Sequence, residues 1–461
     1  MKPPAGPPEF PPRETRVGFV SLGCSKNLVD SEVMLGHLDR AGCTLVRDPA
    51  EADVIVVNTC AFVEAAREES IRAVLEAARL KETGRLRRLV VAGCLVQRSA
   101  RELAESLPEV DAFVGLDELQ RVPVAAGLPE PAGAGPGGLP ILPSGRSTFL
   151  YDDTTPRRRA TAPWTAFVKI AEGCDHTCSF CAIPSFRGEF RSRRPSSILR
   201  EAEELARVGV REISLIAQDS SHFGRDLGIE EGLTRLLEGL NEIEALRWIR
   251  LHYLYPNTVT APLIEALAGL PRVVKYVDLP LQHAHPETLR RMRRGGSARS
   301  HHELLERFRA AIPGISLRST LIVGFPGETE EEFEVLLRFV EEERFHHLGV
   351  FPYSHEEGTA AGELPDDVPA ALKEERRRRI MEVQQRVARE HGARMVGRIV
   401  DVLVEGPHSE TEHLLVGRMS TQAPEVDGVV LLNEGSAAPG AFARVEIREV
   451  AGYDLVGRIL E

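Results

Sequence analysis

Short apolar runs alternate with amphipathic stretches over the first quarter of the chain. Runs such as residues 54–57 have the length of a buried strand, and the stretches between the runs repeat apolar residues at helical spacing. We expect strands at residues 16–24, 53–58, 88–93 and 110–114, and helices at 27–41, 64–80 and 99–107. Alternation of strand and helix is typical of a parallel sheet with helices on its faces.

A second series of apolar segments begins at residue 166. Six candidate strands follow one another, at residues 166–171, 212–217, 248–254, 273–279, 316–323 and 347–353. Amphipathic segments separate them, and in the segment 196–208 the side chains of Ile198, Ala202 and Leu205 share one helical face. Six strand–helix units predict a barrel short of the usual eight, with its active site at the carboxyl ends of the strands.

After about residue 393 the pattern changes to a period of two. Apolar and polar residues alternate in residues 399–405 and 443–447, with glycines between the runs, which predicts a small antiparallel barrel. The expected fold class is α/β, with an N-terminal open parallel sheet, a central partial TIM-like (β/α)6 barrel and a C-terminal small β-barrel. We expect a disordered leader at residues 1–15, domains at 16–127, 161–390 and 393–461, and a Pro/Gly-rich linker at 128–160.

Composition restricts the class of protein. The 461 residues include 57 basic and 69 acidic ones, a formal charge of −12, which excludes a general nucleic-acid binder and suits a basic partner. No apolar run is long enough to span a bilayer, and the proline-rich start does not resemble a secretory signal. The seven cysteines are odd in number and lie where thiols act as ligands, which favours the reducing cytoplasm.

Three of these cysteines lie close together in the sequence. Cys174, Cys178 and Cys181 have the spacing Cys-x-x-x-Cys-x-x-Cys, which suits a loop around one soft metal centre. A closed structural zinc site needs four ligands, and no fourth cysteine or suitable histidine completes this set. Three thiolates on a 4Fe–4S cluster leave one iron open for chemistry. Structural zinc, or three buried thiols without a metal, is the alternative.

A second set of cysteines is spread along the N-terminal sheet. Cys24, Cys60 and Cys94 each follow a predicted strand, and ligands bind at the carboxyl ends of the strands in open α/β sheets. We therefore expect the three thiols to meet at one sheet edge and to form a second three-thiolate site. The alternative is burial of small side chains in turns. Cys43 begins an element instead of ending one, and we assign it to packing.

Other positions at strand ends are candidates for contacts with a cofactor. Gln218 follows the second strand of the predicted partial barrel, and Gly324 and Gly327 follow its fifth strand. The glycines could allow a ligand to approach the backbone, or they could simply form a turn before a helix with an acidic first turn. A run of arginines at 376–379 lies in a charged helix, 370–391, which indicates either a solvated helix face or phosphate contacts.

The chain resembles the methylthiotransferases of the radical S-adenosylmethionine (SAM) superfamily over nearly its whole length. The matching segments are residues 23–27, 58–60, 92–94, 173–181 and 183–188. They include Phe180 before the last cysteine of the loop, which is a further candidate for a contact with the cofactor. By this resemblance Cys174, Cys178 and Cys181 hold the cluster that cleaves SAM, and Cys24, Cys60 and Cys94 hold an auxiliary cluster. The long linker departs from the usual spacing between domains.

Residues 25–32 and 183–185 are similar to the branch of the family that modifies a ribosomal protein. The resemblance implies that a radical derived from SAM removes hydrogen from the β-carbon of an aspartate on the small-subunit ribosomal protein numbered twelve. The auxiliary cluster then delivers sulfur, and a second SAM gives the methyl group. The cofactors implied are two 4Fe–4S clusters and SAM, with an external electron donor and a sulfur source as further partners.

Two other functions fit parts of the sequence. The second branch of the family modifies a tRNA adenosine, and a non-catalytic iron–sulfur electron carrier would also use cysteine clusters. Residues 393–461 hold six arginines, no lysine and eleven acidic residues, a formal charge of −5. An acidic barrel is a poor phosphate binder, so we expect a basic ribosomal protein and not tRNA as the partner.

Overall fold

The computed structural model describes residues 15–128 and 145–460. The chain divides into two compact units. The first contains the residues up to Thr161 together with Ala171–Thr177 and Cys181–Arg193, and the second contains Ala162–Ile170, Cys178–Phe180 and the residues from Arg194 onward. Residues 1–14 of the expected leader and residues 129–144 of the expected linker lie outside the described residues.

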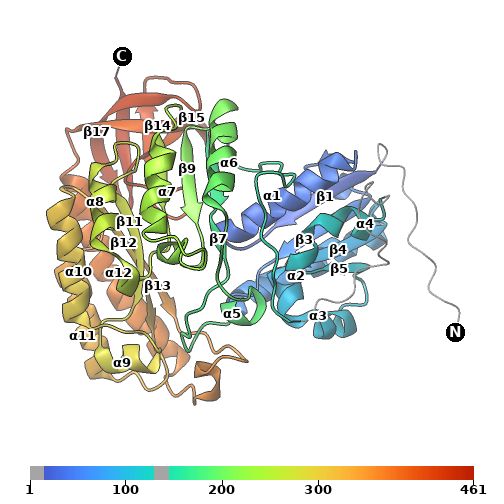
Figure 1. Ribbon diagram of the computed structural model, residues 1–461, viewed down its shortest axis with the longest axis horizontal. Coiled ribbons are helices and arrows are strands. Elements are labelled where there is room, and N and C mark those ends of the chain that lie inside the picture. The colour runs from blue at the N-terminus through green and yellow to red at the C-terminus, as the bar shows by residue number, and fades with distance from the viewer. Residues whose placement is uncertain (1–14, 129–144, 461) are drawn as a thin grey trace, which may run out of the picture. The chain divides into compact units, whose positions relative to one another are not determined.

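The first unit is built on a five-stranded parallel sheet. Its strands are β1 (Arg16–Ser21), β2 (Thr44–Val46), β3 (Val54–Thr59), β4 (Arg88–Gly93) and β5 (Ala112–Val114), in the order β2-β1-β3-β4-β5. The main helices are α1 (Ser25–Arg40), α2 (Glu64–Thr83) and α3 (Cys94–Ser106) (Figure 1). Every residue of β3 and β4 is buried, because helices cover both faces of a central parallel strand. The predicted open parallel sheet is confirmed.

The second unit contains the six predicted parallel strands. They are β6 (Thr165–Lys169), β9 (Glu212–Ile216), β10 (Trp248–Leu251), β11 (Tyr276–Gln282), β12 (Ser316–Val323) and β13 (His347–Pro352). They pair as β6-β9-β10 and β11-β12-β13, and a single bridge from Ile249 to Val273 lies between the two groups. This sequential order is that of a partial barrel.

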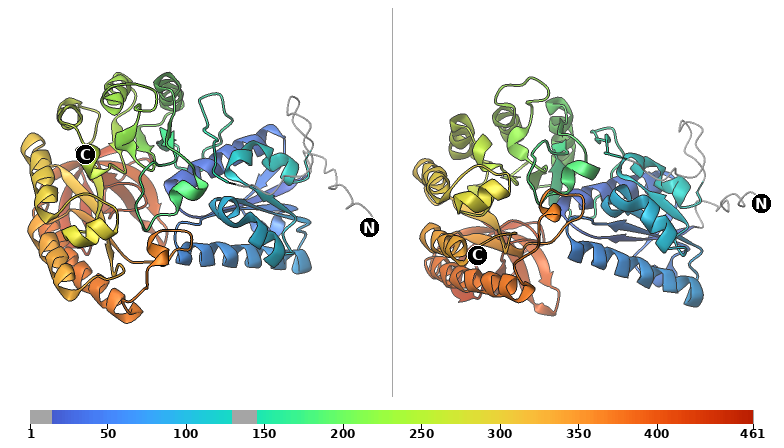
Figure 2. Two further views of the ribbon diagram at one scale, coloured as in Figure 1. Left: turned by 60° about the horizontal axis from the view of Figure 1, so that its bottom comes forward. Right: turned by 90° about the horizontal axis from the view of Figure 1, so that it is seen from below.

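Helices follow the strands of the partial barrel. They are α6 (Pro195–Arg207), α7 (Gly232–Asn241), α8 (Ala261–Gly269), α9 (Pro286–Arg291), α10 (Ala298–Ala311), α11 (Glu330–Glu343) and α12 (Ala370–Ala393). Figures 1 and 2 show α7, α8, α10 and α11 on the outer side of the strands. Because the helices lie along the outer side, the carboxyl ends of the strands are left for loops and ligands.

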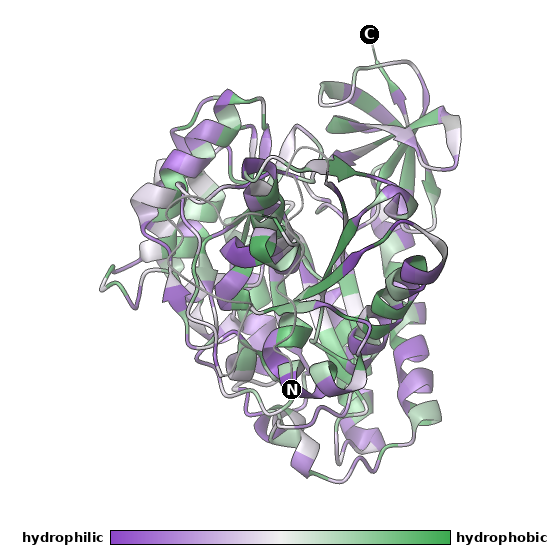
Figure 3. Ribbon diagram, turned by 90° about the vertical axis from the view of Figure 1, so that its right-hand side faces the viewer, coloured by the Kyte–Doolittle hydropathy of each residue, from purple (hydrophilic) through white to green (hydrophobic). Residues whose placement is uncertain are grey.

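A closed five-stranded barrel ends the second unit. Its strands are β14 (Ile399–His408), β15 (Thr411–Met419), β16 (Val430–Glu434), β17 (Phe442–Ala451) and β18 (Asp454–Ile459), joined in the order β14-β15-β16-β18-β17. Hydrophobic stretches along these strands are visible in Figure 3. Val402, Val404, Val445 and Ile447 lie in its core.

In β14, the apolar residues Ile399 and Leu403 of the alternating pattern at 399–405 do not point into the core of the small barrel. Leu403 does not belong to the barrel core but packs with Trp248 and Tyr276 of the partial barrel, and Ile399 is 49% exposed. The inward positions are Val402 and Val404, one residue out of step with Leu403. Both faces of the strand are apolar in this region because the outer face is covered as well.

A buried ion-pair network joins the small barrel to β9 and β10 of the partial barrel. Glu212 accepts hydrogen bonds from Arg250 Nε at 3.0 Å and from Arg418 Nη2 at 2.6 Å, and all three side chains are almost completely buried. Arg418 also binds Glu405 at 2.8 Å. Burial raises the pKa of Glu212, but the two guanidinium groups outweigh this and lower it from 4.5 to about 2.

We expect Glu212→Gln to lower the free energy of unfolding by about 3–5 kcal/mol, because it leaves two buried guanidinium groups without their carboxylate. Urea unfolding of the cluster-free chain measures this effect. Since folding lowers the pKa of Glu212, its contribution is complete above pH 4.5 and is lost as the pH falls toward about 2. Glu204→Gln, in an exposed pair with Arg207 on α6, is the matched control and should change little. Equal effects of the two variants would contradict a docking role for Glu212.

The arginine run of α12 is satisfied within the protein. Arg376 is buried and binds Glu328 at 2.8 Å. For this residue the alternative of a solvated helix face is wrong. Arg377, Arg378 and Arg379 pair with neighbouring glutamates. These contacts favour a structural role over phosphate binding. Among the described residues, no helix has both the length and the apolar character needed to cross a bilayer.

Candidate iron–sulfur sites

The structure brings Cys24, Cys60 and Cys94 to the same edge of the N-terminal sheet. Cys24 caps the start of α1, Cys60 follows β3, and Cys94 is the first residue of α3 after β4. A Cβ atom added to Gly23 would lie 2.8 Å from Cys60 Cβ and 3.0 Å from its Sγ, so the segment bearing Cys24 touches Cys60. Cys43 precedes β2, at the opposite edge of the sheet, and its thiol donates to Leu38 O at 3.2 Å.

Glycines and amides shape the loops that carry these thiols. Gly23 and Gly93 have φ angles of +90° and +96°, which favour glycine, and a Cβ on Gly93 would lie 2.1 Å from Asn58 Oδ1. Asn58 Nδ2 donates to Asn27 O at 2.9 Å, which ties β3 to the start of α1. The Cys94 thiol contacts Asn27 Oδ1 at 3.7 Å. The loops are therefore held by contacts within this unit.

The three thiols have different electrostatic surroundings. Desolvation of its sulfur raises the pKa of Cys24, but the charges of Lys26 and Arg187 and two backbone N–H groups lower that pKa to below its ordinary value. Burial raises the pKa of Cys60, and burial raises that of Cys94 to about 12. Three thiols at one sheet edge, with cations nearby and glycines where side chains would intrude, form a donor set that fits a soft metal cluster.

We expect Gly23→Ala to reduce iron binding at this edge, because its methyl group would occupy the space of Cys60 and its φ is unfavourable for alanine. Iron analysis of a chain that also carries Cys174→Ala, Cys178→Ala and Cys181→Ala isolates the effect. Gly145→Ala is the matched control: Gly145 also has a positive φ, +83°, but an added Cβ there meets no atom within 4 Å. Iron lost equally in both variants would indicate backbone strain and not the contact with Cys60.

Arg187 is a buried cation at the same edge, and the sequence did not single it out. Its Nη2 donates to Cys94 Sγ at 3.0 Å and to Asp30 Oδ2 at 2.9 Å, and its Nη1 donates to Glu172 Oε1 at 2.9 Å. Burial lowers the pKa of Arg187, but Cys94, Glu172 and Asp30 raise it well above its ordinary value. Its position within residues 183–188, which resemble the family, was the only signal in the sequence.

The loop with the other three cysteines follows β7 (Ala171–Glu172), and its first part belongs to the first unit. Gly173 has a φ of +81°, and a Cβ there would lie 2.0 Å from Glu189 O. Cys174 N donates to Gly188 O at 3.1 Å, and Asp175 Oδ1 accepts from Phe190 N at 2.8 Å. Backbone contacts with residues 188–190 thus fix the start of the loop.

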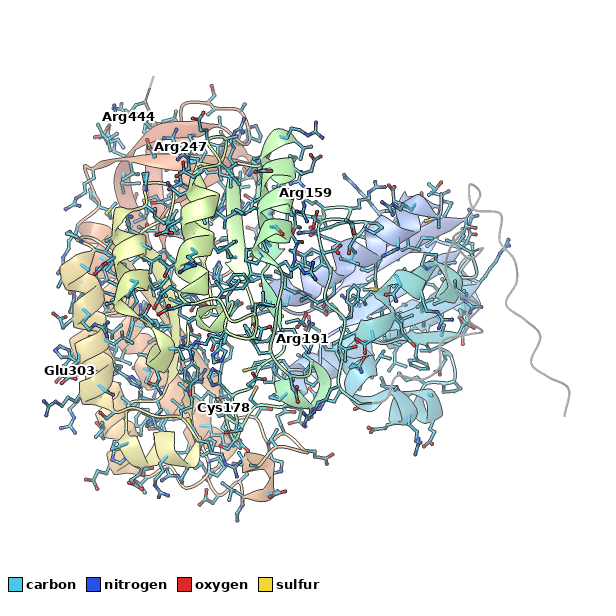
Figure 4. All side chains as sticks on the ribbon, viewed as in Figure 1. Arg159, Cys178, Arg191, Arg247, Glu303 and Arg444 are labelled. Atoms are coloured by element: carbon cyan, nitrogen blue, oxygen red, sulfur yellow. The ribbon has the colours of Figure 1, made fainter. Side chains whose placement is uncertain are left out.

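The middle of the loop belongs to the second unit. Ser179 donates from its backbone N to Met292 O at 3.0 Å, and Ala361 N donates to Ser179 O at 2.7 Å. The Phe180 ring packs on the apolar cluster of Met292, Phe325, Tyr353 and Ala361. Cys178 (Figure 4) receives a hydrogen bond from Arg294 Nη1 at 3.4 Å. Phe180 therefore anchors the loop beside a cysteine that has its own guanidinium partner.

Two of the predicted cofactor contacts at strand ends, Gly324 and Gly327, have local structural roles. Gln218 follows β9 and is partly exposed. Gly324 N donates to Glu328 Oε2 at 2.9 Å, and Gly327 N donates to Asp367 Oδ1 at 2.8 Å. Both glycines have positive φ, so the turn between β12 and α11 explains them without a ligand. Contacts of Phe180, Gln218, Gly324 and Gly327 with SAM remain predictions.

Two further residues at strand ends have unusual backbones. Tyr253 follows β10 with a φ of +59°, and Gln282 ends β11 with a φ of +72°, next to a register shift in its pairing with β12. Left-handed backbone at residues other than glycine is costly and gathers at functional sites. Two strands of the second unit thus have strained backbone at their carboxyl ends, where Gln218 also lies, although positive φ angles occur elsewhere in this unit at Glu231, Arg293, Arg344 and Glu425.

Comparison with known proteins agrees with this architecture. Three family models match in succession: the uncharacterized protein family UPF0004 at residues 16–115, the radical SAM superfamily at 168–340 and the TRAM domain at 396–460. Among solved structures, a radical SAM methyltransferase, TsrM from Kitasatospora setae, superposes with a TM-score of 0.54 at 17% identity, covering 76% of this chain and 77% of that one. This likeness concerns the fold alone.

Curated relatives match nearly the whole length of the chain. A ribosomal protein uS12 methylthiotransferase, RimO, from Anaeromyxobacter sp. (strain K) is 53% identical over 97% of this chain and 93% of its own length. The protein of the same name from Myxococcus xanthus is 47% identical over 96% of this chain and 91% of its own length. The chain therefore belongs to the RimO family of ribosomal protein uS12 methylthiotransferases, within the radical SAM superfamily.

Proposed function

We propose that this protein transfers a methylthio group to the β-carbon of an aspartate of ribosomal protein uS12. The observation that supports this most directly is the second thiol set. Cys24, Cys60 and Cys94 converge at one sheet edge, apart in sequence from the radical SAM loop. A radical SAM enzyme that only cleaved SAM would need one set of three thiolates. Sulfur transfer would require a second cluster, which the second set of thiols could hold.

The residues for the cofactors follow from the two thiol sets. Cys174, Cys178 and Cys181 would hold the 4Fe–4S cluster of the radical SAM superfamily, and Cys24, Cys60 and Cys94 would hold an auxiliary 4Fe–4S cluster. Together with SAM, these groups supply a radical that can break an inert C–H bond, a sulfur atom and a methyl group. An external electron donor and a sulfur source complete the set of partners.

The chain itself has to position and protect these groups. Phe180 and the hydrogen bonds of Ser179 fix the loop that would bind the first cluster. Arg294 and Arg187 each donate to a cysteine sulfur, Cys178 and Cys94 respectively. A β-carbon has no acidic proton, so the site does not require a general base. What it requires is rigid ligands and exclusion of water.

The substrate follows from family and charge together. The C-terminal barrel of this acidic chain carries −5 between residues 393 and 461, which opposes a phosphate backbone and suits a basic ribosomal protein. Not every acidic residue is available for such contacts. Asp427 is buried against the partial barrel, where its carboxylate binds Tyr276 at 2.8 Å and Arg318 at 3.3 Å, so the contact face cannot include it. Glu410 and Glu425 are exposed.

The experiment is an assay of the reconstituted protein with SAM and a chemical reductant on two substrates, uS12 and unmodified tRNA. Mass spectrometry should find methylthio-aspartate in uS12 and no methylthio-adenosine in tRNA. Cleavage of SAM without either product would leave the protein in the radical SAM superfamily but remove the proposed reaction. Absence of SAM cleavage in a fully loaded protein would favour an electron carrier.

A further inference from the structure

Arg187 connects three segments of the first unit through one guanidinium group. It follows α5 (Ile183–Phe186), and its partners are Cys94 at the start of α3, Asp30 in α1 and Glu172 in β7. Cys24 caps α1, and Cys174 lies two residues after Glu172. Within the first unit, the guanidinium therefore lies between the segment that bears Cys174 and the segments that bear Cys24 and Cys94.

The geometry requires the planar fork of an arginine. One terminal nitrogen, Nη2, binds both the Cys94 sulfur and Asp30, while the other, Nη1, binds Glu172. The side chain of Arg187 is 3% exposed, and those of Asp30 and Glu172 are 4% and 5% exposed. A lysine has one compact ammonium on a flexible stem and cannot reproduce these fixed directions. The two carboxylates hold the fork, and the fork points at the sulfur.

A cation that donates to a thiolate ligand has a definite effect on an iron–sulfur cluster. Reduction adds negative charge to the cluster, and hydrogen bonds and positive charge at the sulfurs stabilise that charge. The effect is large in a buried site, because water does not screen the interaction. Loss of the donor should therefore move the reduction potential to more negative values.

We propose that Arg187 is a positioning residue that fixes the Cys94 sulfur and raises the reduction potential of the cluster held by Cys24, Cys60 and Cys94. This inference rests on the auxiliary cluster of the proposed function. Asp30 and Glu172 act through Arg187: they orient its fork and compensate its buried charge. The buried cation comes from residues 183–188, which lie outside the sheet that carries the thiols.

The test uses the full chain with Cys174→Ala, Cys178→Ala and Cys181→Ala, so that the auxiliary cluster is the only cluster. Two variants are compared in this background, Asp30→Asn and Asp30→Asn with Arg187→Met, which differ only in the arginine. A redox titration followed by electron paramagnetic resonance gives the midpoint potential. We expect the arginine-free variant to be at least about tenfold harder to reduce, which for one electron is about 59 mV.

Arg88→Met is the matched control, because Arg88 is also buried but starts β4, whereas Cys94 follows the end of that strand. It should lower stability without moving the potential. If the Arg187→Met chain is insoluble, Arg187→Lys should give a smaller shift in the same negative direction. An unchanged potential and resonance spectrum in loaded Arg187 variants would overturn the role of Arg187. Absence of iron in the background chain would overturn the auxiliary cluster of the proposed function, and this inference with it.

Discussion

Replacement of Cys174, Cys178 and Cys181 together with alanine is expected to abolish reductive SAM cleavage and, with it, methylthio transfer. No other described residues offer three thiols in one loop, and an open iron that binds SAM needs that set. The variant should still hold about half the iron of the full protein, about four atoms in place of about eight, if the second set holds a 4Fe–4S cluster of its own as proposed. Iron analysis and chromatography of 5′-deoxyadenosine measure the two effects.

Cys43→Ala provides the control for this result, since its thiol contacts Leu38 O and lies at the far edge of the sheet. It should keep full iron and full SAM cleavage. Total loss of iron from the triple variant would show that the two sets do not load independently. Residual SAM cleavage in the triple variant would contradict the assignment of the radical SAM cluster.

Replacement of Cys24, Cys60 and Cys94 with alanine should give the complementary result. SAM cleavage should continue, because we assign this set to the delivery of sulfur and not to the radical, while the methylthio product should disappear completely. Alanine is smaller than cysteine and introduces no new atoms, and the hydrogen bond from Asn58 to Asn27 O, which does not involve a thiol, remains to hold the loops. Detection of 5′-deoxyadenosine together with mass spectrometry of uS12 separates the two outcomes. Loss of 5′-deoxyadenosine from a folded variant would contradict this division of roles.

Much of the fold could be predicted because its strands are continuous apolar runs. All six strands of the partial barrel overlap the predicted segments, and β12 has the predicted bounds. The placement of Cys24, Cys60 and Cys94 followed from topology alone, since parallel strands end at the same edge. The alternation of apolar and polar residues was less informative in β14. Leu403 packs against the partial barrel, so side chains on both faces of this strand are buried.

Charged residues of the site could not be predicted in the same way. Arg187 and Asp30 are 157 residues apart in the sequence and become partners only in the folded unit. Arg376 looked like part of a solvated run, but Glu328, 48 residues earlier, holds it in the interior. Asp427 contributes to the acidic charge of residues 393–461, but its carboxylate is bound by Tyr276 and Arg318. Composition gives the charge of a segment but not the partner of each charge.

The central claim is that this protein modifies an aspartate of uS12. The most direct measurement is mass spectrometry of ribosomal proteins and of tRNA from cells with and without the gene for this chain. We predict that the methylthio group on the uS12 aspartate is lost on deletion and restored by the wild-type gene but not by the variant lacking Cys24, Cys60 and Cys94, while tRNA is unchanged. Unmodified tRNA adenosine in the deletion strain, with uS12 unaffected, would contradict the account.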